Sequence, residues 1–291
     1  MKKQILIFGI VLLIFTACQQ KTIEFGKNSF TIEKNISYGS DPNQKMNVYI
    51  PENTAHKKDV FIIIHGGGWR AGEKSQLTGF THQLMKKFPQ YIFVNMDYRL
   101  ASTTQYALPH QTDDIKNVMM YLEKTLKIKP NYILLGNSAG GHLSMFYAYQ
   151  FNQNKKIKAV VNIVGPADLN DPGFKNYDEY SFVEKHLIDP NIVKNKTSLM
   201  DFGSPTHWVT KTSTPTLSFY GTQDTVVPLS QKEILDSVLD KNKVYHQSYE
   251  FNGTHLSWEN EINSAFLIEK IDLFLKNIDK KINAPISQSV Y

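Results

Sequence analysis

One serine of this chain lies in a setting that could make it a nucleophile. Ser138 is the central residue of the stretch 136–140, which reads Gly-x-Ser-x-Gly. The apolar run 132–135 before it predicts a strand, and residues 141–149 after it predict a helix. A tight turn between two such elements exposes the serine hydroxyl beside the free N–H groups of a helix N-terminus. Ser138 is therefore the candidate nucleophile.

A serine hydroxyl needs a base, and the base needs a carboxylate. Histidine titrates near neutral pH and is the usual base, while the carboxylate fixes its tautomer and stabilises the imidazolium. Asp224 follows a predicted strand at 215–220, and His255 follows the last predicted strand, at 243–251. The carboxyl ends of parallel strands meet at one edge of a sheet, so we expect Ser138, Asp224 and His255 to lie together as a catalytic triad.

The other histidines and carboxylates fit these roles less well by position. We expect His142 to turn away from the serine, because it lies one turn along the predicted helix. We expect His65 to support a neighbouring loop through a hydrogen bond. The remaining candidates lie in a segment without clear periodicity or within and beyond a helix: His186, His207, Asp236 and Asp240. The histidines show no spacing typical of a metal site, so no metal and no cofactor is implied.

A second motif supplies hydrogen-bond donors. The wholly apolar run 60–64 runs directly into 65–69, which reads His-Gly-Gly-Gly-Trp. Three successive glycines cost backbone entropy, and their use is the close approach of bare N–H groups to a ligand. In acyl transfer that ligand is the oxyanion of a tetrahedral intermediate. We therefore expect the N–H groups of Gly67, Gly68 and Ala139 to form an oxyanion hole.

Apolar runs and helical periodicities alternate along the chain. Such alternation predicts an α/β fold with a mostly parallel central sheet and helices on both faces. Asp113 and Asp114 fall in the first turn of one predicted helix, where carboxylates favour the helix dipole. The predicted strands are 31–38, 45–50, 60–64, 91–96, 132–135, 157–164, 215–220 and 243–251, and the predicted helices are 110–127, 141–149, 178–186, 229–239 and 259–277.

The stretch 165–214 lacks a clean period and separates two predicted core strands. About fifty residues are too many for a simple connection. We expect a small internal lid insertion over the nucleophile, which shapes the substrate pocket. Tyr177, Tyr180, Phe182 and Trp208 either line that pocket or pack the insertion onto the core.

The composition is that of an ordinary globular protein. Of 291 residues, 41% are hydrophobic and 20% are charged, and the net charge is +5. Loss of Lys2 and Lys3 with a leader would lower that charge to +3. Such a weak positive charge gives no support for nucleic-acid binding. The single cysteine leaves no internal disulfide.

The N-terminus has the pattern of a targeting signal. Two lysines precede the apolar run 5–15, which is too short to span a membrane and fits a secretory signal. The only cysteine, Cys18, follows it. This pattern resembles a bacterial lipoprotein signal, with a signal peptide at 1–17, lipidation at Cys18, a tether at 18–28 and the globular domain at 29–291. The resemblance implies an exported protein, lipid-anchored to a bacterial membrane in the cell envelope; a plain secretory signal is the alternative.

The motifs together resemble serine esterases of the α/β-hydrolase fold. The likeness is to the feruloyl/acetyl-esterase-like branch, which is related to the hormone-sensitive-lipase-like branch. Ser102 stands where the lipase-like branch often has proline, and the expected lid is internal. The matching stretches are 65–69, 97–100, 136–143, 221–228 and 253–255.

This resemblance implies a carboxylic ester hydrolase that acts through an acyl-enzyme intermediate. Its substrates would be short-chain or aromatic acyl esters, including esters linked to carbohydrate. Two alternatives stay open: an amide hydrolase of aryl-formamidase or peptidase type, and a non-catalytic surface lipoprotein that binds a ligand on a hydrolase scaffold. Peptidases of this fold usually carry a large extra domain, whereas non-catalytic relatives usually lose a member of the triad.

Overall fold

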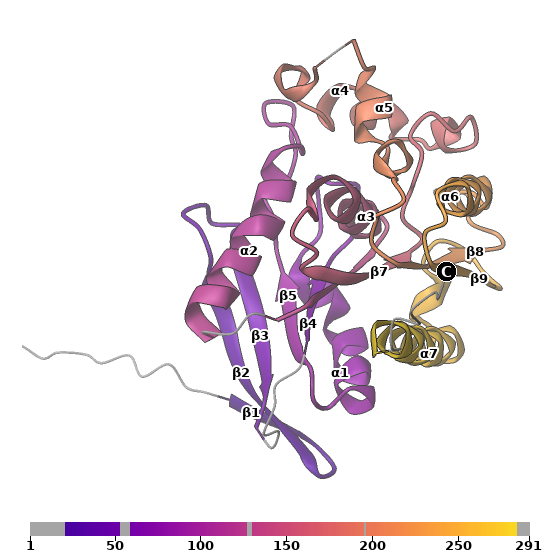
Figure 1. Cartoon of the computed structure of the whole chain (residues 1–291). Helices are drawn as coiled ribbons and strands as arrows, with labels where there is room; N and C mark the ends of the chain where they lie inside the picture. Colours follow the sequence, from indigo (N-terminus) through magenta and orange to yellow (C-terminus); the bar gives the residue numbers. More distant parts are fainter. Residues whose placement is uncertain (1–20, 53–58, 127–129, 195, 284–291) are drawn as a thin grey trace, which may run out of the picture.

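The computed structural model describes residues 21–52, 59–126, 130–194 and 196–283 (Figure 1). The expected signal peptide, Cys18 and the C-terminal tail lie outside these residues. The strands are β1 (Lys21–Phe25), β2 (Asn28–Ser37), β3 (Lys45–Pro51), β4 (Val60–Ile64), β5 (Ile92–Met96), β6 (Tyr132–Asn137), β7 (Ile157–Ile163), β8 (Thr216–Gly221) and β9 (His246–Phe251). The helices are α1 (Thr78–Lys87), α2 (His110–Leu126), α3 (Ala139–Phe151), α4 (Tyr180–His186), α5 (Leu199–Gly203), α6 (Ser230–Lys241) and α7 (Glu261–Asn283).

The strands form one nine-stranded sheet in the order β1-β2-β3-β5-β4-β6-β7-β8-β9. β4 to β9 run parallel to one another, while β1, β2 and β3 pair antiparallel at one edge. Every residue of β4, β5 and β6 is buried. A strand covered on both faces needs apolar side chains at successive positions, which explains the unbroken apolar runs of the sequence.

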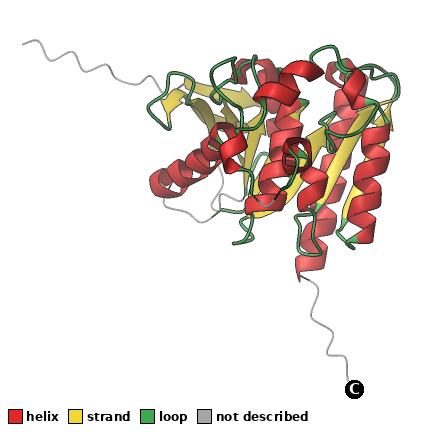
Figure 2. Cartoon of the chain, turned by 90° about the horizontal axis from the view of Figure 1, so that it is seen from above, coloured by secondary structure: helices red, strands yellow, loops and turns green. Residues whose placement is uncertain are grey.

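Helices cover both faces of the sheet (Figure 2). One hydrophobic core contains buried side chains of α2, α3 and α6, and a second core contains those of α1 and α7. The expected mostly parallel sheet with helices on both faces is confirmed. Because all parallel strands point the same way, the loops that carry the glycine motif, Ser138, Asp224 and His255 leave the sheet at one edge.

Two segments differ from the sequence expectations. Residues 21–25, placed in a tether, form β1 and pair antiparallel with β2, with Phe25 packed edge-on against Phe30 at 6.4 Å. The expectation of a tether over 18–28 is therefore wrong for this part. The helix α1 is absent from the elements that the sequence predicts. Its apolar side chains are few, and its buried face is defined by the distant helix α7, which it contacts.

The segment 165–214 lies between β7 and β8 and contains short helices, among them α4 and α5. Figure 1 shows them at the top of the molecule, beyond the end of α2. The chain is tied there to an earlier segment, because the Leu108 N–H donates to Leu187 O at 2.8 Å. Across the described ranges, no helix is long and apolar enough to cross a membrane.

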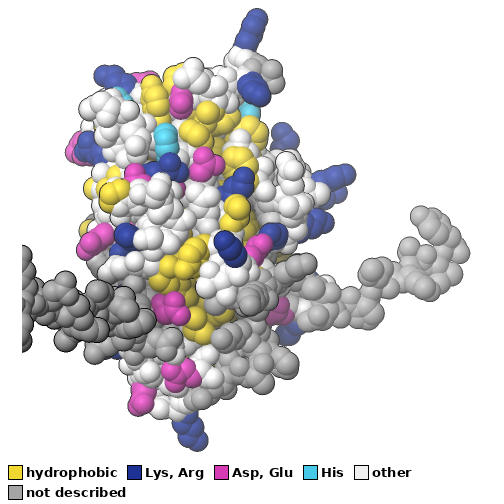
Figure 3. All heavy atoms as spheres, turned by 90° about the vertical axis from the view of Figure 1, so that its left-hand side faces the viewer, with side chains coloured by type: hydrophobic (Ala, Val, Ile, Leu, Met, Phe, Trp, Pro, Cys, Tyr) yellow, Lys and Arg dark blue, Asp and Glu magenta, His cyan; other side chains and the backbone are white. Residues whose placement is uncertain are grey.

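The side of the molecule that carries α2 has a groove with a mixed polar and apolar lining. It has a volume of about 330 Å³ and lies between α2 and the end of α3, where Met119 and Tyr147 contribute to its lining. Met120 and Phe151 also line it and are 58% and 47% exposed. Figure 3 faces this side and shows hydrophobic side chains among charged ones. Ser138 and His255 line a different hollow.

Candidate active site

Ser138 occupies a strained turn between β6 and α3. Its φ is 53° and its ψ is −122°, a conformation that costs energy in a residue other than glycine and that recurs in nucleophile elbows. Its N–H donates to Ile163 O at 2.8 Å, and its carbonyl accepts from the His142 N–H at 3.0 Å. A Cβ on Gly140 would lie 2.0 Å from Ile64 O. The glycine therefore lets α3 begin directly against the end of β4.

Asp224 and His255 form a hydrogen-bonded pair. Asp224 Oδ2 lies 2.7 Å from His255 Nδ1, and the aspartate side chain is fully buried. The other carboxylate oxygen, Oδ1, accepts from the N–H groups of Val226 at 2.8 Å and Val227 at 2.9 Å. The carboxylate is thus fixed by the turn after β8. This network assigns the proton to Nδ1 and leaves His255 Nε2 as an acceptor.

Ser138 and His255 line the same cleft, which has a volume of about 660 Å³. Gly66, Gly67 and Gly68 line it as well. No hydrogen bond joins Ser138 Oγ to His255 Nε2 among the contacts of the described residues. Such bonds are often long before substrate binds and then tighten.

The glycine loop presents unpaired donors to this cleft. Gly67 has φ +111°, and a Cβ there would lie 2.2 Å from Ala71 O, so only glycine fits. The N–H groups of Gly67 and Gly68 donate to no acceptor within the described part of the chain. Ala139 is the first residue of α3, so its N–H has no partner within the helix. Gly67 and Gly68 line the cleft, and Ala139 directly follows Ser138, so the unpaired N–H groups belong to residues in or next to the serine's cleft.

The BD-FAE family matches residues 46–239, which is more than half of the chain. The chain belongs to the BD-FAE family.

Two curated proteins are also similar in sequence. Esterase LipC of Mycobacterium tuberculosis is 25% identical over 215 residues, which cover 68% of this chain and 52% of LipC. A kynurenine formamidase of Meyerozyma guilliermondii is 32% identical over 113 residues, which cover 38% of this chain and 41% of that protein. The chain thus spans about half, or less, of the length of these curated relatives.

Solved structures support the fold. Esterase B from Lactobacillus Rhamnosis superposes with a TM-score of 0.69 and 20% identity over 88% of both chains. A truncated carbohydrate esterase from gut microbiota gives a TM-score of 0.67 and 20% identity, and covers 86% of this chain and 97% of the other. The predicted α/β-hydrolase fold is confirmed.

His65 of this BD-FAE chain supports the glycine loop through a hydrogen bond. Its Nδ1 lies 2.7 Å from Gly66 O, and its ring stacks on Tyr98 with centroids 4.2 Å apart. The Tyr98 hydroxyl donates to His65 O at 2.9 Å. Burial lowers the pKa of His65, which keeps the ring neutral with one proton to donate. The hydrogen bond to Gly66 O is the kind of supporting contact that we expected for His65.

His142 joins three parts of the molecule. It is fully buried on α3; its Nε2 donates to Gly203 O at 2.8 Å, and its Nδ1 accepts from Trp69 Nε1–H at 3.1 Å. Burial lowers its pKa to about 4, so the ring is neutral at pH 7. It does not line the cleft, and instead connects the glycine loop, the serine helix and the insertion.

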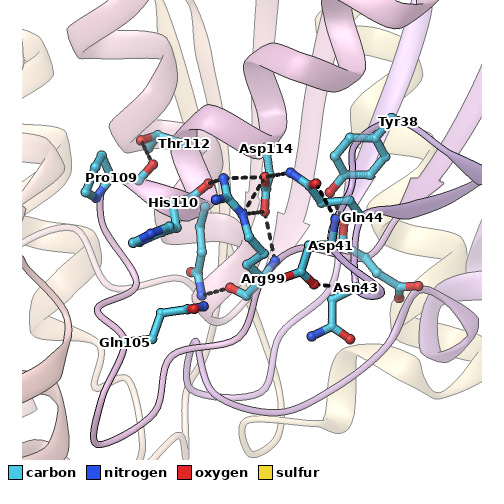
Figure 4. Close-up of polar contacts among 12 residues, drawn as sticks. Tyr38, Asp41, Asn43, Gln44, Arg99, Gln105, Pro109, His110, Thr112 and Asp114 are labelled. Carbon is cyan, nitrogen blue, oxygen red and sulfur yellow. Dashed lines mark hydrogen bonds and ion pairs between the residues drawn. The ribbon is translucent and has the colours of Figure 1, made fainter.

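A buried ion pair fixes the chain after β5 (Figure 4). Asp114 of α2 has a fully buried side chain and accepts from Arg99 Nε at 3.0 Å and Nη2 at 2.7 Å. Gln44 Nε2 donates to the same carboxylate at 2.7 Å. The neighbouring Gln111 donates from Nε2 to Trp69 O at 2.7 Å. Asp114 thus does more than favour a helix dipole, since its hydrogen bonds fix Arg99 and Gln44. Gln111, on the same helix, fixes Trp69 at the end of the glycine motif.

The insertion contributes Tyr177 and Glu179 to the cleft. Of the aromatic residues weighed as pocket-lining, Tyr177 is there, whereas the other three pack. Tyr180 donates its hydroxyl to Leu169 O at 3.0 Å, Phe182 lies under the Arg70 guanidinium, and Trp208 packs edge-on against Phe202 at 5.4 Å.

Sequence reasoning missed three charged residues of the cleft, Arg70, Glu179 and Glu259, of which the first two form an ion pair. The signal that could have found Arg70 is its place directly after the glycine motif. Glu179 had no such signal, because its position depends on how the insertion folds back. Within the described ranges, no group of three or more His, Cys, Asp or Glu side chains is arranged to hold a metal ion.

Proposed function

We propose that this protein is a serine carboxylic ester hydrolase. The observation that carries the proposal is the hydrogen-bonded Asp224–His255 pair, whose histidine lines one cleft with a strained serine and with the glycine loop. A base with a fixed tautomer, a nucleophile and oxyanion donors are the components of acyl transfer. The similarity to esterase LipC supports the same reaction class.

The catalytic sequence follows from these groups. Ser138 Oγ attacks the ester carbonyl while His255 Nε2 takes its proton. The N–H groups of Gly67, Gly68 and Ala139 stabilise the resulting oxyanion. His255 then gives the proton to the leaving alcohol, and the acyl group remains on Ser138. Water attacks this acyl-enzyme with His255 again as the base, which releases the carboxylic acid and restores the serine.

The cleft favours modest acyl groups. Its volume of about 660 Å³ and its open, partly polar lining suit short-chain or aromatic acyl esters of small or carbohydrate alcohols. The fold similarity to a carbohydrate esterase from gut microbiota and to a bifunctional GH43-CE protein of Bacteroides eggerthii supports the carbohydrate part. The similarity to a kynurenine formamidase favours one second candidate, the hydrolysis of an aryl-formamide by the same groups.

We also propose that the protein is exported and held to a bacterial membrane through a lipid on Cys18. The support is the N-terminal pattern of lysines, an apolar run and a lone cysteine. Labelling of cells with a radioactive fatty acid should mark the wild type and not Cys18→Ser. Equal labelling of both would contradict the anchor.

The catalytic proposal is tested with a protein that starts at Gln19, beside its Ser138→Ala variant. The substrate panel contains p-nitrophenyl acetate and butyrate, methyl ferulate and an aryl-formamide. We expect ester turnover that falls by about 10⁴-fold or more in Ser138→Ala, since residual activity would come only from the oxyanion donors. Turnover of the formamide alone would favour the second candidate. Activity on none of the four would refute hydrolysis, and equal activity of both proteins would refute the role of Ser138.

A further inference from the structure

Two polar groups of the insertion overhang the glycine loop. A Cβ built on Gly68 would lie 3.7 Å from the Tyr177 hydroxyl and 3.9 Å from Glu179 Oε2. Gly68, whose N–H has no acceptor among the described residues, lines the same cleft as Ser138. A substrate whose carbonyl lies at this loop therefore extends beneath the Tyr177 hydroxyl and the Glu179 carboxylate.

The Glu179 carboxylate is held in place from both sides. Its Oε1 forms an ion pair with Arg70 Nη2, and its Oε2 accepts from the Tyr177 hydroxyl at 3.5 Å, a long hydrogen bond. The Arg70 guanidinium is in turn supported by the Phe182 ring, 4.6 Å from the ring centroid. An acceptor, a donor and a hydroxyl that can do both thus stand together at the wall of the cleft.

Stability does not account for this arrangement. The Arg70 and Glu179 side chains are 38% and 40% exposed, and exposed ion pairs contribute little to folding. The long Tyr177–Glu179 bond is weak and leaves capacity for a better partner. A ligand hydroxyl can donate to Glu179 Oε2 and accept from Arg70 or Tyr177 at the same time.

The charge of the cleft limits which ligand groups can bind there. Glu259 also lines it, and its carboxylate makes no ion pair or hydrogen bond with the described residues; partial burial raises its pKa. With Arg70 already paired to Glu179, the fixed charge of the cleft is negative. An anionic ligand group is therefore disfavoured, and a neutral hydroxylated group fits.

We propose that Tyr177, Glu179 and Arg70 form a subsite that binds neighbouring hydroxyl groups on the uncharged part of the ester that lies over Gly68. This inference rests on the proposed ester hydrolysis and adds the residues that select among esters. The insertion then acts as a specificity element, because it brings the carboxylate and the phenol to the glycine loop.

The test compares two acetate esters of similar size, glycerol monoacetate and propyl acetate, by the acetic acid released. Only the first carries free hydroxyl groups. We expect the ratio of their kcat/KM values to fall about 10-fold in Tyr177→Phe and in Glu179→Gln, mainly through the KM for glycerol monoacetate. Tyr177→Phe keeps the Arg70–Glu179 ion pair, so it separates the lost hydroxyl from any movement of the loop. The matched control is Asp178→Asn, an exposed carboxylate between the two positions, which should keep the wild-type ratio.

The outcomes distinguish this inference from the function on which it rests. If the wild type hydrolyses both esters and the variants change both kcat/KM values by the same factor, the residues only shape the loop and the subsite is refuted. An unchanged ratio in both variants refutes it as well. If the wild type hydrolyses neither these esters nor the p-nitrophenyl esters, the proposed function fails first and the subsite fails with it.

Discussion

At the scale of single residues, three hydrogen bonds fix the position of the Asp224 carboxylate. Both oxygens are used, one by His255 Nδ1 and one by the N–H groups of Val226 and Val227. In Asp224→Asn, an amide that keeps the backbone contacts would turn its NH₂ toward His255 and favour the wrong tautomer. We expect kcat to fall by about 10⁴-fold with little change in the melting temperature.

Steady-state kinetics and a thermal melt of the same preparation check this expectation. The matched control is Asp240→Asn, whose side chain is 80% exposed at the end of α6 and which should keep wild-type activity. A loss of less than 10-fold in Asp224→Asn would contradict the assignment of Asp224 as the partner of the catalytic base.

Protonation of the buried His142 should lower the free energy of unfolding in acid. Burial lowers its folded-state pKa to about 4, below the ordinary value of 6.5, so the unfolded chain binds the proton more readily. The free energy of unfolding is therefore unaffected above about pH 6.5 and falls as the pH drops toward 4, by about 3 kcal/mol in total. Urea unfolding of the wild type at pH 7 and pH 4.5 measures this loss.

Comparison variants assign that loss to His142. We expect His142→Gln to be less stable than the wild type at pH 7 but to lose less on acidification. The exposed His207→Gln should keep the full acid sensitivity. Burial also lowers the pKa of His65, so part of the dependence should remain in His142→Gln. Identical pH dependence in all three proteins would show that protonation of His142 is not involved.

At the scale of elements, the contact between β4 and the start of α3 depends on Gly140. A Cβ there would meet Ile64 O at 2.0 Å and His65 O at 2.6 Å, both backbone atoms that cannot rotate away. We expect Gly140→Ala to lower the free energy of unfolding by about 3 kcal/mol and to displace Ser138, with loss of activity. Denaturant unfolding and kinetics on one ester measure both effects.

Gly79 is the matched glycine of a different element. It lies in α1, and a Cβ there would have no atom within 4 Å. Gly79→Ala should raise the free energy of unfolding by about 0.5–1 kcal/mol, because alanine loses less backbone entropy in a helix. Equal effects of the two substitutions would contradict the argument from close approach.

The elements that could be predicted from the sequence are those in which the burial of side chains follows one regular pattern. Strands buried on both faces, such as β4, show an unbroken apolar run, and long helices such as α2 show a clear period. The missed elements gain their order from pairing or packing with another element, whether adjacent or distant in sequence. β1 has only five residues and gains its order from pairing with β2, and α1 buries few side chains against α7.

At the scale of the whole molecule, chain order and strand ends predict that the candidate residues lie at one edge of the sheet. The glycine motif, Ser138, Asp224 and His255 all follow predicted strands, and the structure places Asp224 and His255 within hydrogen-bonding distance. The contacts of Arg70 with Glu179 and of His142 with Gly203 could not be predicted. They join segments far apart in sequence through an insertion whose path follows no periodic pattern.

Gln231 ties that insertion to the core. Its side chain is fully buried on α6, the helix that follows the Asp224 loop. Oε1 accepts from the N–H groups of Ala167 at 2.7 Å and Asp168 at 2.8 Å. Nε2 donates to Asp168 O at 2.7 Å and to Asp171 Oδ2 at 3.0 Å. The Gln231 amide thus provides hydrogen-bond partners for backbone groups at the start of the insertion, where the chain leaves β7.

Gln231→Leu should therefore loosen the insertion more than the sheet. The leucine fills the space but leaves two backbone N–H groups without an acceptor, at a cost of about 1–3 kcal/mol each. We expect faster proteolytic cleavage within 165–214, and a KM for ester substrates that rises because Glu179 is no longer held over Gly68. Glu233→Leu, an exposed position on the same helix, should cleave at the wild-type rate. If cleavage instead appears first in α7 or β9, the insertion and the sheet unfold as one unit, and the amide stabilises the whole domain rather than the wall of the cleft.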